Sequence, residues 1–173
     1  MKKSSNLNKA VFLDRDGVIN REKGNYIFNI EDFEFNEGIF KNLALMRDNG
    51  FFLIIITNQG GIARGLYTHE QLNNLHAYMN KYMAVNKIYI SEIYYCPHHP
   101  STGKCLCRKP ESLMIEKAIS RFSIDRSRSF MIGDNERDTE AARRAGVKGI
   151  LINANEPLDK YLDIIIGKDR INV

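Results

Sequence analysis

Ala10-Val11-Phe12-Leu13-Asp14-Arg15-Asp16-Gly17 is the stretch of sequence that decides the fold. Its apolar residues predict a buried strand that ends at Asp14, and the glycine allows the chain to turn sharply just beyond it. Two carboxylates two residues apart repel each other unless a cation or a proton lies between them. This stretch is therefore either a Mg²⁺-binding pair in which one carboxylate attacks phosphorus, or an acidic turn in solvent.

Outward from this strand, apolar runs alternate with helical patterns along the chain. The wholly apolar run 51–56 predicts a second buried strand, and weaker signals predict strands at 93–95, 129–132, 148–152 and 164–166. Helical patterns cover 39–49, 68–84, 112–122 and 136–145, and Thr68 with Gln71 predicts a capping box at the start of the second helix. The alternation predicts a single α/β domain over residues 1–173, with a Rossmann-like parallel sheet and helices on both faces. Ligands of such sheets bind at the carboxyl ends of the strands.

The composition is that of an ordinary globular protein. Of the 173 residues, 43% are hydrophobic and 27% are charged, and the net charge is +4. This mild basicity is compatible with an anionic substrate or with weak nucleic-acid contact, and it establishes neither. The lysines at positions 2 and 3 are followed by polar residues, and the apolar run 51–56 is too short to cross a bilayer. We therefore expect a cytoplasmic protein that does not associate with membranes.

Two further groups of polar residues follow predicted strands. Thr57-Asn58-Gln59-Gly60 comes after the run 51–56, where a hydroxyl and glycine-rich backbone could donate hydrogen bonds to a phosphoryl group. A polar turn is the ordinary alternative. Gly133-Asp134 ends a later strand, and Asp138 lies one helical turn further on. Carboxylates suit Mg²⁺, but acidic residues also favour the first turn of a helix, which accounts for Asp138 better than for Asp134.

All three cysteines of the chain lie within one short segment. Cys96-Pro97-His98 is followed, after six residues, by Cys105-Leu106-Cys107. Three thiolates and one imidazole are enough for a tetrahedral zinc site, and four protein ligands leave no open position for catalysis. We therefore predict a structural Zn²⁺ held by Cys96, His98, Cys105 and Cys107, which would staple a loop directly before Arg108 and Lys109.

The order of these motifs is more specific than any one of them. Asp-x-Asp-Gly, an apolar strand ending in threonine, a lysine and Gly-Asp-x-x-x-Asp together resemble the haloacid dehalogenase (HAD) superfamily of phosphotransferases, from residue 10 to about residue 152. The resemblance implies that Asp14 is the nucleophile, and that Asp16 first protonates the leaving group and then activates water. It also implies the following groups: Thr57 and Lys109 on the phosphoryl oxygens; Asp14, Asp16 and Asp134 around Mg²⁺; Asp138 and Asn135 behind them.

Within that superfamily, the sequence resembles the D-glycero-D-manno-heptose 1,7-bisphosphate 7-phosphatases of bacterial surface-glycan synthesis, including that of the lipopolysaccharide core. The similarity lies in residues 14–20, 57–59, 61–65, 94–100 and 105–110. It implies a small phosphorylated sugar as substrate, and these substrate contacts: Arg108, Asn58, Gln59, Arg64, Glu22 and Tyr26. Between Gly17 and Thr57 there is no room for a cap domain, so loops must form the walls of the pocket.

Three departures from the family pattern bear on this reading. The zinc loop is short, Gly60 stands where serine is common, and Asn135 stands where lysine often follows the aspartate. The short loop is similar to that of histidinol-phosphate phosphatases, which are the alternative in the same class. A zinc-containing module that binds nucleic acid is a more remote alternative, because the sequence has no basic stripe. We expect a monomer that binds no nucleic acid.

Overall fold

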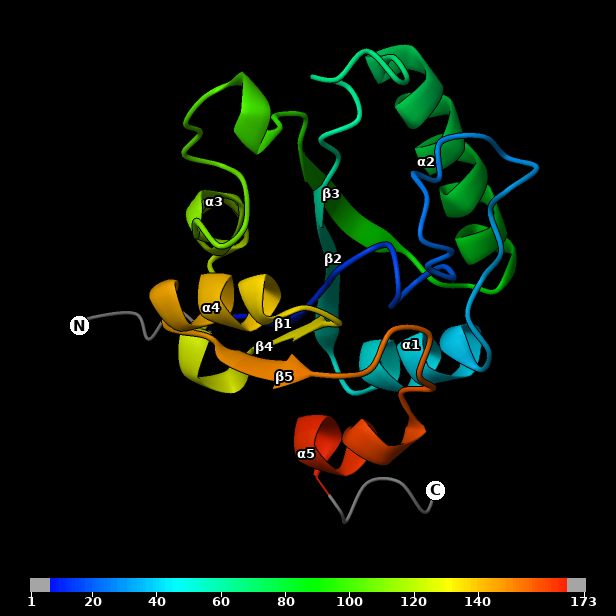
Figure 1. Ribbon diagram of the computed structural model, residues 1–173. Helices are drawn as coiled ribbons and strands as arrows, with labels where there is room; N and C mark the ends of the chain where they lie inside the picture. Colours follow the sequence, from blue (N-terminus) through cyan, green and yellow to red (C-terminus); the bar gives the residue numbers. More distant parts are fainter. Residues whose placement is uncertain (1–6, 168–173) are drawn as a thin grey trace.

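The computed structural model describes residues 7–167, and its centre is a five-stranded parallel sheet (Figure 1). The strands lie in the order β3-β2-β1-β4-β5. Their bounds are β1 Lys9–Leu13, β2 Phe51–Asn58, β3 Ile90–Cys96, β4 Phe130–Gly133 and β5 Lys148–Leu151. The predicted parallel sheet is confirmed, with β1 at its centre between β2 and β4.

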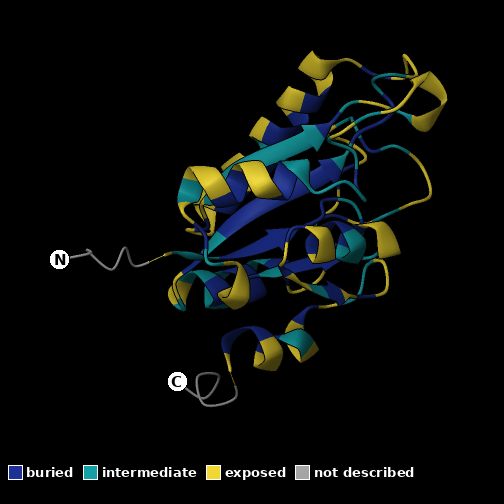
Figure 2. Cartoon of the chain, turned by 90° about the vertical axis from the view of Figure 1, so that its left-hand side faces the viewer, coloured by how far each residue is buried: buried dark blue, intermediate teal, exposed yellow. Residues whose placement is uncertain are grey.

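Helices cover both faces of the sheet. Val11 and Leu13 of β1 face a core formed with α1 (Ile39–Asp48), α2 (His69–Val85) and α5 (Leu162–Ile166). Ala10 and Phe12 face the opposite core, formed with α3 (Leu113–Phe122) and α4 (Glu136–Arg144). Successive side chains of a strand point to opposite faces, so a wholly apolar strand is what a sheet covered on both sides requires. Figure 2 shows the inner strands in dark blue, as buried, between helices that are partly buried and partly exposed.

The start of α2 follows the sequence prediction closely. The Thr68 hydroxyl accepts a hydrogen bond from the Gln71 N–H at 3.1 Å, and the Gln71 side chain accepts one from the Thr68 N–H at 2.9 Å. This reciprocal capping box satisfies two backbone donors that the first turn of a helix leaves free.

The strand predicted at 164–166 is wrong. These residues belong to α5, a short helix that follows a 3₁₀ turn at Asp159–Tyr161. Leu162, Ile165 and Ile166 are buried, and their spacing of three and four residues is that of one helical face. The β-branched run suggested a strand, but packing of this face against the core decided the local structure.

The carboxyl ends of the strands meet at one edge of the sheet, where the long loops gather (Figure 2). Between β1 and β2 the chain forms only a loop and α1, so no cap domain is inserted there, as predicted. Because no cap domain lies between β1 and β2, loops alone enclose this edge of the sheet. None of the described helices is long and apolar enough to cross a membrane. The lysines at positions 2 and 3 lie outside the described residues.

Candidate active site

Three predicted site residues meet at the carboxyl edge of the sheet. Asp14, Thr57 and Asp134 each stand at or just beyond the end of a strand, and these strands are neighbours because β1 pairs with both β2 and β4. All three line one cleft of about 200 Å³. The separate motifs of the sequence thus form one site, as parallel strand ends require.

Lys109 lies beneath this cleft and is 1% exposed. Its Nζ lies 2.9 Å from Asp14 Oδ1 and 2.7 Å from Asp138 Oδ1, and it donates a 2.7 Å hydrogen bond to the Ile56 carbonyl. An ammonium group has three donors, so all three are used within the protein. Lys109 therefore neutralises and orients Asp14 here, and its predicted contact with a phosphoryl oxygen stays a prediction.

Asp14 is 4% exposed, and its surroundings act on its pKa in opposite directions. Burial raises the pKa of Asp14 to about 7, although the charge of Lys109 acts to lower it and the charge of Asp138 acts to raise it. The Arg15 N–H also donates to Asp14 Oδ1 at 2.7 Å. A carboxyl group with this environment gains from any further positive charge in the cleft.

The carboxylates of Asp14, Asp134 and Asp138 form a cluster that fits a divalent cation. One oxygen from each lies within 4.8 Å of the others, and oxygen ligands from carboxylates are what Mg²⁺ prefers. Burial is also the main reason why the pKa of Asp134 is raised. Gly17, with φ +83°, makes this approach possible, because a Cβ there would lie 2.3 Å from Asp134 Oδ2. The donor set and the space therefore agree with the predicted Mg²⁺.

Asp16 also lines the cleft, but its carboxylate lies apart from the three-carboxylate cluster. Its carboxylate is not part of the cluster but accepts hydrogen bonds from Arg15, Asn20 and Gln59. Burial by itself would raise the pKa of Asp16, but the Arg15 guanidinium and these hydrogen bonds outweigh burial and lower it. The Asp16 carboxylate thus does not join the cluster in this arrangement, and the predicted Mg²⁺ contact of Asp16 stays a prediction.

Gln59 and Asn58, both predicted to contact substrate, have side-chain amides that form hydrogen bonds within the protein. Gln59 is 1% exposed, and its Nε2 donates to both Asp16 Oδ2 (3.0 Å) and Thr57 Oγ1 (2.8 Å). Asn58 lines the cleft, but its amide makes two hydrogen bonds with the backbone of Lys109. The Gln59 amide thus holds the Asp16 and Thr57 side chains and the Asn58 amide holds the Lys109 main chain, and their predicted contacts with substrate stay predictions.

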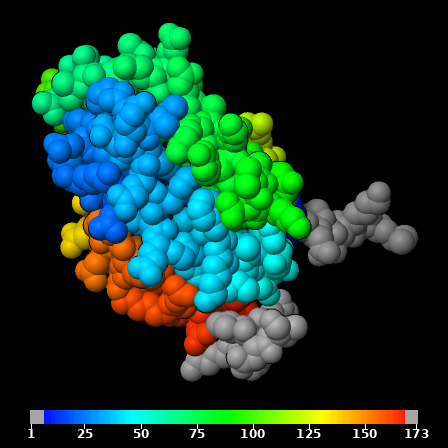
Figure 3. Space-filling model, turned by 90° about the vertical axis from the view of Figure 1, so that its right-hand side faces the viewer, coloured from blue at the N-terminus to red at the C-terminus, as the bar shows by residue number. Residues whose placement is uncertain are grey.

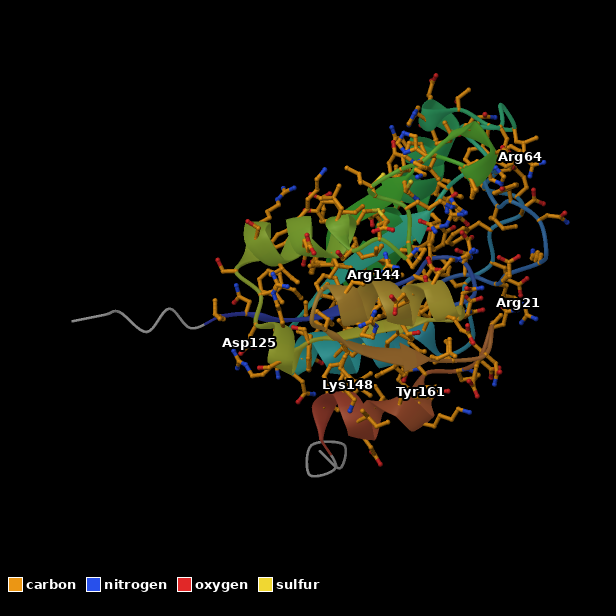
Figure 4. All side chains as sticks on the ribbon, turned by 60° about the vertical axis from the view of Figure 1, so that its left-hand side comes forward. Arg21, Arg64, Asp125, Arg144, Lys148 and Tyr161 are labelled. Atoms are coloured by element: carbon orange, nitrogen blue, oxygen red, sulfur yellow. The ribbon has the colours of Figure 1, made fainter. Side chains whose placement is uncertain are left out.

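The remaining predicted substrate contacts form the walls of the cleft and of its neighbours. Glu22, Tyr26 and Arg108 line the 200 Å³ cleft, while Arg64 lies over the Tyr26 ring, 5.9 Å from its centroid. Arg64 belongs to an adjoining hollow of about 460 Å³, which shares Glu22 and Tyr26 with the cleft. In Figure 4, Arg64 is labelled at the end of the molecule where the loops gather, far from Asp125.

Arg137 is a wall residue that the sequence reading missed. It lines the cleft and also a larger hollow of about 810 Å³ beside the zinc loop, and Arg108 lines both as well. Its signal in the sequence was its place in the first turn of the helix after Asp134, a position that usually favours acidic residues. Asn135, predicted to stand behind Asp134, caps this helix by accepting a hydrogen bond from the Arg137 N–H at 3.2 Å.

The three cysteines and His98 converge as predicted. Cys105 Sγ lies 3.6 Å from Cys96 Sγ and 3.2 Å from Cys107 Sγ, and the His98 Nδ1 atom lies 3.0–3.5 Å from the three sulfurs. A tetrahedral zinc with 2.3 Å bonds to sulfur needs sulfurs about 3.8 Å apart, whereas a disulfide would need about 2 Å. All three cysteines are free, so the donor set fits Zn²⁺. His99 takes no part, because its Nδ1 contacts the Ser101 hydroxyl.

Comparison with known proteins assigns the chain to a family. A family profile described as HAD-hydrolase-like matches residues 106–160. The D-glycero-beta-D-manno-heptose-1,7-bisphosphate 7-phosphatase of Haemophilus ducreyi is 43% identical over 170 residues, covering 92% of this chain and 93% of that protein. The chain belongs to the heptose-1,7-bisphosphate 7-phosphatase family. The predicted resemblance to the HAD superfamily is thereby confirmed, as is the capless HAD fold.

Relatives in this heptose-1,7-bisphosphate 7-phosphatase family carry names for both sugar anomers. A D-glycero-alpha-D-manno-heptose-1,7-bisphosphate 7-phosphatase of Campylobacter jejuni is 46% identical over 148 residues, covering 86% of this chain and 83% of that protein. A solved D,D-heptose 1,7-bisphosphate phosphatase from B. bronchiseptica, complexed with magnesium and phosphate, superposes with a TM-score of 0.78 at 32% identity, covering 83% of this chain and 79% of that one.

Proposed function

We propose that this chain is a Mg²⁺-dependent phosphatase that removes the 7-phosphate of D-glycero-D-manno-heptose 1,7-bisphosphate in heptose synthesis for the lipopolysaccharide core. Membership of the heptose-1,7-bisphosphate 7-phosphatase family supports the substrate. The observation that carries the chemistry is the convergence of Asp14, Thr57 and Asp134 on one cleft, with Lys109 buried beneath it.

In the proposed reaction, a carboxylate oxygen of Asp14 attacks phosphorus, and the bond between phosphorus and the sugar oxygen breaks. Asp16, in its protonated form, gives its proton to that oxygen as it leaves; because Arg15 lowers the pKa of Asp16, this form is the minor one near neutral pH. Water then attacks the phosphoryl group on Asp14 while Asp16 takes the proton of the water, which frees phosphate and restores Asp14. Covalent catalysis divides one difficult hydrolysis into two easier steps, and proton transfer by Asp16 contributes about 10²–10⁴-fold.

The hydrogen bonds around the cleft suit these roles. Thr57 Oγ1 accepts from Gln59 Nε2, so the Thr57 hydroxyl proton is free to point at a phosphoryl oxygen. Lys109 balances the charge of Asp14 and holds its carboxylate in one orientation. A bound Mg²⁺, held by Asp14 and Asp134, would supply positive charge for the phosphoryl oxygens.

Arginines and an aromatic ring line the outer walls and would hold the rest of the substrate. Arg108 and Arg137 face both the cleft and the hollow beside the zinc loop, where a second phosphate would meet two guanidinium groups. Glu22 and Tyr26 would lie along the sugar. Gly60 brings Arg108 close, because a Cβ at position 60 would lie 3.1 Å from Arg108 Nη1. A zinc ion held by the cluster would fix Cys107 and with it the adjacent Arg108 and Lys109.

Phosphate release from a panel of substrates tests this function. The panel contains both anomers of heptose 1,7-bisphosphate, heptose 7-phosphate, fructose 1,6-bisphosphate and histidinol phosphate, each with and without Mg²⁺. We expect the highest kcat/KM for one heptose bisphosphate anomer and no turnover without Mg²⁺. A preference for histidinol phosphate would overturn the substrate, and Mg²⁺-independent turnover would overturn the chemistry.

A further inference from the structure

Among the residues that the structure describes, Arg15 is the largest side chain that is completely buried, with 0% exposure. A guanidinium group cannot lose its charge in a protein, so full burial is costly unless each donor finds an acceptor. Arg15 lies between the two acidic residues of the site in sequence, yet it does not line the cleft. A costly buried charge that touches no substrate needs another explanation.

One side of the Arg15 guanidinium grips Asp16. Nη2 lies 2.8 and 2.9 Å from the two Asp16 oxygens, and Nε lies 3.2 Å from Oδ1. Paired contacts of this kind fix a carboxylate in its plane as well as in its distance. Asn20 and Gln59 complete the shell around the same carboxylate, at 3.0 Å each. The orientation of Asp16 is therefore set mainly by Arg15.

The same guanidinium also holds the loop that walls the cleft. Nη2 donates a 2.7 Å hydrogen bond to the Ile27 carbonyl, next to Tyr26. In Figure 3, residues 20–35 of this loop, in blue, pack against the green surface of α2. Ring contacts of Phe33 with Tyr78 and of Phe35 with Tyr82 join the two segments. Arg15 thus contacts both Asp16 and the loop that walls the cleft beside Tyr26, and it links the two.

His76 contacts the remaining nitrogen of the Arg15 guanidinium, Nη1. It lies on α2, is 6% exposed, and its Nε2 stands 3.4 Å from Arg15 Nη1. Because a guanidinium only donates, Nε2 must accept, which places the imidazole proton on Nδ1. The His76 ring also meets the Tyr95 ring edge-on at 5.9 Å, so it has little freedom to turn.

We propose that Arg15 is a positioning residue that aims the Asp16 carboxylate at the leaving oxygen, and that His76 acts through Arg15 to hold it there. This inference rests on the proposed function, because it assumes that Asp16 transfers the proton. Misplacement of a catalytic group by about 1 Å can reduce the rate about 10²-fold. A chain of three fixed side chains, reaching from α2 to the cleft, prevents such displacement.

The test uses two substitutions of similar size at His76, a residue outside the cleft. His76→Gln keeps an acceptor for Arg15 Nη1, whereas His76→Met removes it. Each variant is assayed with two substrates: the heptose bisphosphate, whose alcohol leaving group needs a proton, and 2,4-dinitrophenyl phosphate, whose leaving group does not. The readout is kcat/KM, which reports the steps up to the first bond cleavage. Arg15→Lys, which keeps the charge but loses the paired contact, is the second test.

We expect His76→Met to reduce kcat/KM about tenfold for the sugar phosphate and less than twofold for the aryl phosphate, with His76→Gln close to wild type on both. Arg15→Lys should show the same selectivity more strongly. Partial unfolding would reduce both substrates equally, so equal losses would overturn the positioning role, as would no loss in His76→Met.

Asp16→Asn separates failure of this inference from failure of the proposed function. If Asp16→Asn reduces both substrates equally, Asp16 is not the acid and the proposed mechanism is wrong. If Asp16→Asn is selective but His76→Met and Arg15→Lys are not, the mechanism stands and the positioning role is wrong. If the heptose bisphosphate is not a substrate, the same comparison is made with any alkyl phosphate that the enzyme hydrolyses.

Discussion

Replacing Asp138 by asparagine removes one of the two carboxylates that hold Lys109. Asp138 is fully buried, and its Oδ1 lies 2.7 Å from Lys109 Nζ. Asparagine has nearly the same shape and can still accept the hydrogen bond from the Asn135 N–H that now ends on Asp138 Oδ2. The helix cap therefore survives the change, but the amide nitrogen then faces Lys109 Nζ, so the perturbation is the loss of one buried negative charge together with the acceptor that it offered Lys109.

The size of the effect follows from what remains around Lys109. Removing one partner from a buried ion pair costs about 3–5 kcal/mol, because it leaves the other charge uncompensated. Lys109 keeps Asp14 at 2.9 Å and the Ile56 carbonyl at 2.7 Å, which places the loss at the lower end, about 3 kcal/mol. For a chain of this size that corresponds to a fall in Tm of about 6–12 °C. Turnover should also fall, since Asp138 belongs to the carboxylate cluster.

Urea unfolding at pH 7.5, followed by circular dichroism, measures the free energy of unfolding of Asp138→Asn. Glu136→Gln is the matched control, because it removes an exposed carboxylate from the same first turn of α4. We expect the control to change the free energy of unfolding by less than about 0.5 kcal/mol. Equal stability of Asp138→Asn and wild type would refute the claim that the buried pair with Lys109 stabilises the fold.

Three further predictions concern the nucleophile, the zinc loop and a buried histidine. Asp14→Asn should abolish phosphate release while the circular dichroism spectrum stays unchanged, because an amide does not attack phosphorus; rapid-quench mass spectrometry should find phosphorylated Asp14 only in the wild type. Dilute EDTA should stop turnover reversibly yet leave about one zinc per chain, since structural zinc binds with about 10–16 kcal/mol. Cys105→Ser should lose the zinc and should have a lower Tm and a lower kcat/KM. A zinc-free chain with full activity would exclude the site. Burial, and then the charge of Arg15, lowers the pKa of His76 to about 3, so the unfolded chain takes up a proton below pH 6.5 that the folded chain refuses. The free energy of unfolding should therefore decrease as the pH is lowered. Between pH 6.5 and 5.0 it should decrease by about 1.6 kcal/mol more in the wild type than in His76→Gln. Parallel pH profiles of the two proteins would contradict a buried neutral imidazole.

Much of the site was predictable because it stands at strand ends. Asp14, Thr57 and Asp134 each follow an apolar run, and parallel strands bring such positions to one edge whatever the loops between them do. The zinc ligands were predictable for a different reason: Cys96, His98, Cys105 and Cys107 use every cysteine of the chain within one segment. In both cases a short local pattern carried the information.

The contacts that the sequence does not reveal depend on which way a side chain turns. Gln59 and Asn58 stand at the same strand end as Thr57, yet their amides form hydrogen bonds with Asp16 and with the Lys109 backbone. Arg15 is the reverse case, since a charged residue between two acids suggests solvent but is buried here. Such choices are made by partners far away in sequence, and His76, sixty-one residues from Arg15, has no local signal at all.

The position of the zinc ligands separates two parts of one loop. Cys96 ends β3, and Cys105 and Cys107 stand just before Arg108 and Lys109, so the metal would clamp the two ends of the loop together. The residues between His98 and Cys105 then hang outside the clamp, where they form a short exposed 3₁₀ turn held by its own hydrogen bonds. Insertions or deletions in this outer turn would leave Lys109, beneath Asp14, undisturbed. Evolution, or an engineer, could therefore exchange the outer turn to change which phosphate esters enter, while the catalytic centre is inherited intact.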